Sequence, residues 1–136
     1  LALLRWGFLT GDRSAIATAT RALNSAAPLV QADPLQHLAL LEALDELLNP
    51  TTIVILRGPD DVTSLWQREL ARLYAPQRLV FVWPDKAVEL PINAREMESA
   101  SQGVAYLFRG FELESVVTDF GELVRLLRDG IILPEE

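Results

Sequence analysis

Three short apolar runs constrain the fold of this chain more than any other feature. They are TIVIL at Thr52–Leu56, LVFVW at Leu79–Trp83 and VAYLF at Val104–Phe108. Runs of this length, rich in β-branched and aromatic residues, are typical of strands that are buried on both faces. Between the first two runs, Val62 to Tyr74 has apolar residues at helical spacing. The order strand, helix, strand predicts a βαβ unit.

The predicted strands place the chain in the α/β fold class. Because crossover connections between parallel strands are right-handed, few strand orders remain. We expect a three-stranded, mostly parallel, Rossmann-like sheet in the order 2-1-3, with helices on both faces. Asp119 and Glu122 resemble a capping box, which predicts a helix from Glu122 to Arg128. A short helix is also expected over residues 93–100.

The first part of the chain follows a helical pattern instead. Residues 1–9 look like the end of a helix, which Gly11 can close in the left-handed conformation. Asp12 can cap a second helix, roughly Arg13 to Ala26. This second helix is expected to end at Pro28, because the residue before a proline disfavours helical geometry.

A third helix is predicted at Asp33-Pro34, where aspartate can cap and proline can take the first helical position. Apolar residues at helical spacing continue it to about Leu48, and Asn49-Pro50 stops it. We therefore divide the chain into a helical segment, residues 1–49, and a small α/β domain, residues 50–136.

Composition excludes several kinds of function. The formal net charge is −7, and the chain contains no cysteine and a single histidine. An acidic chain disfavours nucleic acid and anionic membranes as partners. Without cysteine there is no disulfide, no thiolate metal site and no thiol catalysis. We expect no cofactor and no metal, and a cysteine-free chain fits a reducing, cytoplasmic location.

No spacing of side chains indicates catalysis within this chain. His37 has no second ligand at metal spacing and no identifiable orienting partner, so we expect a packing or surface role. The carboxylates of the middle and late chain form no recognisable glycosidase pair, and the serines lie in no nucleophile-elbow motif. Trp6 is expected to lie on an exposed apolar surface that seeks a partner.

The best candidate ligand site is a crevice at the carboxyl ends of the first and third predicted strands. Ligands of open α/β sheets bind where the connections from neighbouring strands diverge, and a 2-1-3 order places that point here. Backbone N–H groups at the following helix could hold an anion, with arginines assisting. An ordinary strand–turn–helix corner is the alternative. The candidate ligand-binding residues are Arg57, Gly58, Asp60, Asp61, Arg109 and Gly110.

The same residues argue against a nucleotide as the ligand. The first turn offers Gly58 alone where a dinucleotide-binding loop has several glycines. Pro59 removes one N–H donor. Asp60 and Asp61 place carboxylates where phosphates would lie. We therefore predict that the chain does not bind nucleotides.

The segment from Gly103 to Asp119, GVAYLFRGFELESVVTD, resembles a short motif near the end of spermatogenesis-associated protein 20-like proteins. Members of that family read roughly A-Y-V-C-R-x-F-x-C-x-x-P-V-T-D. This chain has phenylalanine, leucine and valine where the pattern has its two cysteines and its proline, at Phe108, Leu113 and Val116. The residues that match are Ala105, Tyr106, Arg109, Phe111, Val117, Thr118 and Asp119.

Three further segments are similar to the same family. They are Leu9 to Asp12 as a turn between helices, Thr51 to Gly58 as a first strand, and Tyr74 to Pro76 as a helix end. The resemblance implies a parent protein with a thioredoxin-like domain, an (α/α) toroid of the six-hairpin glycosidase type and a small α/β region. The helical segment would then be the end of the toroid.

Three functions remain open from the sequence. The first is a non-catalytic structural or interaction module of such a parent, bound to the rest of it or to a second copy through the N-terminal helices. The second is a part of an enzyme that acts on carbohydrate or in thiol redox chemistry, with its active centre outside this chain. The third is a small-ligand domain that uses the crevice near Gly58 and Gly110.

Overall fold

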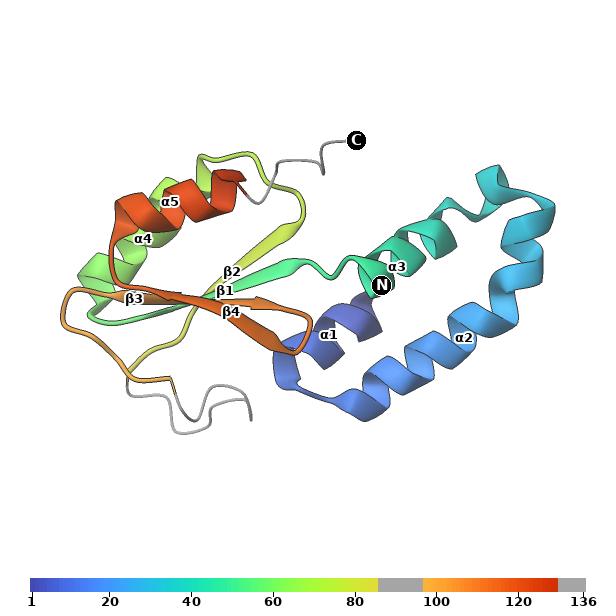
Figure 1. Ribbon diagram of the computed structural model, residues 1–136, viewed down its shortest axis with the longest axis horizontal. Helices are drawn as coiled ribbons and strands as arrows, with labels where there is room; N and C mark the ends of the chain where they lie inside the picture. The colour runs from blue at the N-terminus through green and yellow to red at the C-terminus, as the bar shows by residue number, and fades with distance from the viewer. Residues whose placement is uncertain (86–96, 130–136) are drawn as a thin grey trace.

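The computed structural model describes residues 1–85 and 97–129. A helical arm extends from one end of a small α/β part (Figure 1). The arm consists of α1 (Ala2–Thr10), α2 (Arg13–Ala32), the short 3-10 helix η1 (Pro34–His37) and α3 (Leu38–Leu48). The α/β part consists of β1 (Thr52–Arg57), α4 (Asp60–Ala71), β2 (Arg78–Val82), β3 (Val104–Arg109), β4 (Glu112–Val117) and α5 (Phe120–Asp129).

The chain is α/β as predicted, but its sheet differs from the expected one. Within the described residues it has four strands in the order β2-β1-β3-β4, of which only β1 and β2 are parallel. Val82 ends β2 beside Leu56, and Val104 begins β3 beside Arg57. The connection from β2 to β3 therefore leaves and returns at the same end of β1, so β3 must run in the opposite direction.

The fourth strand, β4, was missed because it contains the charged residues Glu112 and Glu114 and resembled a polar loop. It pairs with β3 through a two-residue turn at Gly110 and Phe111. Gly110 has φ of 59°, and glycine at the first turn position is typical of such hairpins. Charged residues are common on edge strands, where they discourage unwanted pairing.

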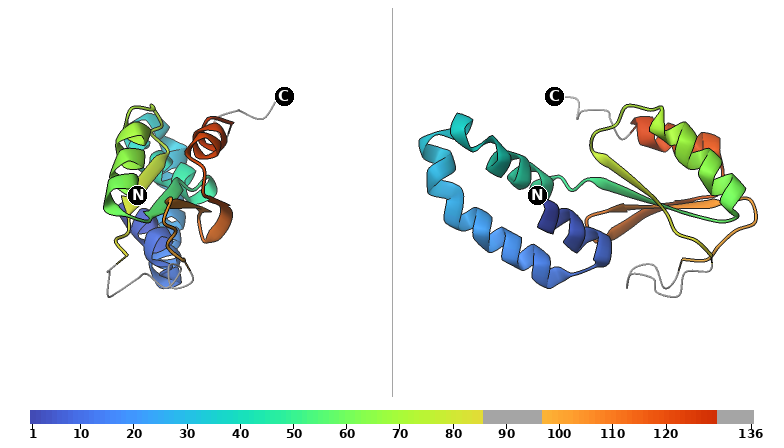
Figure 2. Two further views of the ribbon diagram at one scale, coloured as in Figure 1. Left: turned by 90° about the vertical axis from the view of Figure 1, so that its left-hand side faces the viewer. Right: turned by 180° about the vertical axis from the view of Figure 1, so that it is seen from behind.

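Both helices of the α/β part lie on the same face of the sheet, rather than on opposite faces (Figure 2). Trp66 of α4 packs against Phe120 of α5, with ring centroids 5.5 Å apart. The apolar core beneath them is formed by Val54, Leu56, Trp66, Leu70, Ala105, Leu107, Val117, Leu123 and Leu127. The opposite face of the sheet packs against the arm through Leu4, Phe8 and Ala43.

Capping residues in the sequence determine most of the helix boundaries in the arm. Gly11 adopts φ of 73° after α1, and the Asp12 carboxylate accepts hydrogen bonds from the N–H groups of Ser14 and Ala15. The predicted stop at Pro28 is wrong, since α2 continues to Ala32. Pro28 lies inside α2, where a proline removes one helical hydrogen bond and crowds the carbonyl four residues before it, yet the helix goes on for another turn. Asp33 accepts from the Gln36 N–H and begins η1, as expected.

A buried carboxylate joins the arm to the sheet. Glu46 of α3 is 6% exposed and accepts hydrogen bonds from the N–H and hydroxyl of Thr51, at 2.9 and 2.7 Å. It also pairs with the Arg5 guanidinium of α1 at 3.0 Å. One side chain thus holds two helices and the residue that precedes β1.

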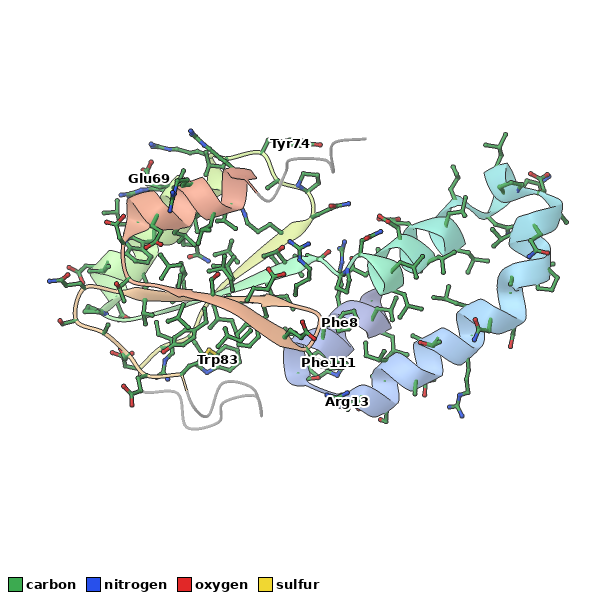
Figure 3. The ribbon with its side chains drawn as sticks, viewed as in Figure 1. Phe8, Arg13, Glu69, Tyr74, Trp83 and Phe111 are labelled. Carbon is green, nitrogen blue, oxygen red and sulfur yellow. The ribbon has the colours of Figure 1, made fainter. Side chains whose placement is uncertain are left out.

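The hairpin turn makes a second contact with the arm. Phe111 lies edge-on to Phe8 of α1, with centroids 5.2 Å apart, and the Arg13 guanidinium of α2 lies 4.6 Å above the Phe111 ring (Figure 3). Such aromatic and cation–π pairs add to the apolar area that they bury. The arm is therefore anchored at the start of β1 and at the β3–β4 turn.

We predict that Glu46→Ala lowers the free energy of unfolding by about 1–3 kcal/mol, because the buried Thr51 N–H loses its acceptor. The measurement is chemical denaturation followed by circular dichroism. Glu42→Ala, at an exposed position of the same helix, is the matched control and should change stability by less than about 0.5 kcal/mol. Equal effects of the two substitutions would contradict the role of Glu46.

Candidate functional site

The candidate ligand residues predicted from the sequence do not come together. In the β1–β3 register, Arg109 lies opposite Thr52 and Arg57 lies opposite Val104. Arg57 and Gly58 are therefore at one end of the sheet, and Arg109 and Gly110 are at the other. The expected crevice required a parallel third strand, and the antiparallel pairing separates its two halves.

Arg109 and Gly110 have local roles at their end of the sheet. Arg109 forms an ion pair with Glu114 of β4 at 3.1 Å, with both side chains about half exposed. A Cβ at Gly110 would lie 3.5 Å from Pro50 and 3.6 Å from Phe8. Gly110 therefore allows the β3–β4 turn to pack closely against the arm.

Gly58 does not lie in an open loop, because its segment crosses the segment of Ala100 and Gly103 in close contact. Its φ is 140°, and a Cβ there would lie 2.9 Å from the Gly103 Cα and 3.0 Å from the Ala100 carbonyl oxygen. Gly103 is equally constrained, because its own Cβ would lie 2.8 Å from Val62. Asp60 and Asp61 are exposed in the first turn of α4, where carboxylates favour the positive end of the helix.

Arg57 is the most unusual of the predicted residues. It is 8% exposed, its Nη1 donates to the Met97 carbonyl, and its Nη2 lies 3.9 Å from the Asp85 carboxylate. Arg57 thus contacts the described residues on both sides of segment 86–96. Within the described ranges its Nε has no hydrogen-bond partner, and neither has Trp83 Nε1.

A hollow on the sheet face opposite α4 and α5 is the cavity that sequence reasoning missed. It is open to solvent, has a volume of about 480 Å³ and is lined by Met97, Glu98, Tyr106, Phe108, Phe111, Leu113 and Val116. The Tyr106 hydroxyl donates to the Glu98 carbonyl at 2.8 Å and fixes one wall. The lining is mostly apolar, so the hollow suits an apolar ligand group rather than a phosphate.

One signal could have indicated this hollow. A strand alternates its side chains between two faces, so Tyr106 and Phe108 share a face. The β3–β4 register adds Leu113 and Val116, which lie opposite Phe108 and Tyr106. Without recognition of β4, these residues could not be brought together from the sequence.

The described residues offer little for acid–base or metal chemistry. No group of three or more His, Asp or Glu side chains within them could hold a metal ion. The Ser14 hydroxyl, with the Ala15 and Ser14 N–H groups, lowers the pKa of Asp12, and burial lowers the pKa of Arg78. Both shifts arise from structural contacts.

Among the described helices, none is long and apolar enough to cross a bilayer.

Comparison with known proteins adds no relative. No protein-family model matches the sequence, and no curated protein or solved structure matches it either.

We predict that Arg57→Met lowers the free energy of unfolding by about 1–3 kcal/mol, since the buried Met97 carbonyl loses its donor. The measurement is urea denaturation at neutral pH. Arg72→Met removes an exposed arginine that pairs with Glu69 and is expected to cost less than about 1 kcal/mol. A loss no larger than that of Arg72→Met would contradict a structural role for Arg57.

Proposed function

We propose that this chain is a non-catalytic structural and interaction module of a larger protein. The helical arm is its docking surface, and its main partner is the rest of the parent. On the resemblance of the Gly103–Asp119 segment, the parent is of the spermatogenesis-associated protein 20-like type, with a thioredoxin-like domain and an (α/α) toroid. We place this parent in the cytoplasm.

The observation that carries this proposal is the apolar surface of the arm. Of the eleven exposed large apolar residues within the described ranges, seven lie in the arm. Exposed apolar groups concentrated on one part of a molecule are typical of surfaces that bind a partner. The seven are Leu3, Trp6, Leu29, Leu35, Leu38, Leu44 and Leu48, and Trp6 and Leu48 are 58% and 68% exposed.

The sequence of α3, LALLEALDELL, shows the same property within one helix. Ala43 and Glu46 face inward and are buried, whereas Leu38, Leu44 and Leu48 are exposed. A helix that is apolar around most of its circumference is normally covered on several sides. In this arm α3 packs against α1, α2 and η1, which leaves its outer leucines for a partner.

Two of the positions at which the chain departs from the family pattern lie together in the sheet. Phe108 and Leu113 stand where the pattern has two cysteines, and they lie directly opposite each other in β3 and β4. Here both are apolar, so thiol chemistry of the parent would lie outside this chain.

The two candidate binding partners of the arm surface are those predicted from the sequence. The first is the toroid of the parent, and the alternative is a second copy of this chain bound through the same helices. An enzymatic role in carbohydrate or thiol redox chemistry would belong to the parent's other domains.

The test is co-expression of this chain with the remainder of its parent as a separate polypeptide. Trp6→Ser combined with Leu48→Ser should weaken the association by about tenfold or more, because two exposed apolar side chains leave the interface. The chain itself should keep its thermal midpoint. Leu113→Ser, an exposed leucine outside the arm at 49% exposure, is the matched control and should leave the association unchanged. Equal weakening by both variants would contradict docking through the arm.

A second candidate function, small-ligand binding, is favoured by the hollow of about 480 Å³ beside Tyr106. We predict that small aromatic compounds bind there, because its lining is mostly apolar. In a methyl-labelled sample, a titration should shift the signals of Met97, Leu113 and Val116 saturably. Absence of shifts at millimolar concentration, or shifts confined to arm leucines, would contradict this candidate.

A further inference from the structure

The two edges of the sheet differ in how they are protected. β4 carries Glu112 and Glu114, and its pairing with β3 is interrupted by a register shift beside Phe108. Charges and such bulges are devices by which natural sheets prevent edge-to-edge pairing. β2 has no such bulge, and the guanidinium of its one charged residue, Arg78, donates to the Leu70 and Leu73 carbonyls. Its sequence is RLVFV, its register with β1 is continuous, and every residue of it is half-buried.

The hydrogen bonds of β2 show which backbone groups face outward. The Thr52 N–H donates to the Gln77 carbonyl, and the Trp83 N–H donates to the Leu56 carbonyl. Backbone groups alternate sides along a parallel strand, so residues 77, 79, 81 and 83 bond to β1. Arg78, Val80 and Val82 therefore present their N–H and C=O groups to the outer edge, where the described part of the chain places no further strand.

We propose that β2 pairs with β2 of a second copy of this chain, antiparallel and centred on Val80. In this register Val80 faces Val80 of the other copy, and Arg78 faces Val82. All the outward N–H and C=O groups of the strand then find partners. A register shifted by two residues would leave part of them unpaired, so the centred register is the most complete one.

The side chains are also self-complementary in this register. Leu79 and Phe81 of the two copies oppose each other on one face, and the Val80 residues oppose each other on the other face. Aromatic–aliphatic pairs of this kind stabilise antiparallel strands. The charged group of Arg78 does not face its equivalent, because its guanidinium donates to the Leu70 and Leu73 carbonyls near the end of α4.

The pairing would make one continuous sheet from two four-stranded ones, related by a two-fold axis. Since the arm is attached at the start of β1 (Figure 2), the two arms would extend from opposite ends of the strands. The arm surface would stay free for the parent. This inference therefore does not depend on the proposed function.

The test is sedimentation equilibrium of the wild-type chain and three variants. Val80→Pro removes an outward N–H without removing a bond to β1, and prolines are tolerated on edge strands for this reason. We expect a wild-type dimer, a dissociation constant raised at least about tenfold in Val80→Pro, and a wild-type constant in Val80→Thr. The arm variant Trp6→Ser with Leu48→Ser should also keep the dimer.

Several outcomes would overturn the proposal. One is a wild-type chain that stays monomeric at about 0.5 mM, which is about five-hundredfold above a dissociation constant of about 1 μM. The others are a Val80→Pro variant that still dimerises as the wild type does, and an arm variant that loses the dimer while Val80→Pro keeps it. If Val80→Pro does not fold, a single Val80→Cys substitution decides instead, since the wild-type chain has no cysteine. The two Cα atoms at the axis of such a pair would be close enough for a disulfide. Cross-linking no faster than that of Ser64→Cys, on exposed α4, would refute the pairing.

Discussion

The carboxylate of Glu46 is the contact on which the arrangement of the two parts of this chain depends. A charged group at 6% exposure is stable only when its lone pairs are satisfied, and here Thr51 and Arg5 satisfy them. Because Thr51 immediately precedes the central strand, the direction in which α3 leaves the sheet is set by the same hydrogen bonds. The edge contact of Phe8 with Phe111 then fixes the rotation of the arm about that point. The positions of the exposed apolar residues of the arm follow from these two contacts.

Most local elements were predictable because short-range physical chemistry determines them. The strand runs were assigned from β-branched and aromatic composition, and the structure confirms all three. Asp12 and Asp119 were expected to cap helices, and each accepts hydrogen bonds from the following N–H groups. Pro28 shows the limit of such rules, since α2 continues through it to Ala32.

The candidate site was less predictable, because one topological assumption controlled it. A parallel third strand would have placed Arg109 beside Arg57, and the antiparallel one moves it to the far end of the sheet. The missed strand β4 had a similar effect, since the hollow beside Tyr106 exists only when β4 supplies its outer wall. The first error concerns pairing between strands far apart in sequence, which composition and periodicity do not specify. The second arose because the charged residues of β4 resembled a polar loop.

The crossing of Gly58 and Gly103 has a consequence for the evolution of this chain. A Cβ at either position would meet the backbone or side chain of the other segment at under 3 Å. A single substitution at one glycine therefore cannot be accommodated unless the second segment moves away. Proteins that share this packing should therefore keep glycine at both positions. In a sequence alignment, the two glycines would then mark the fold together.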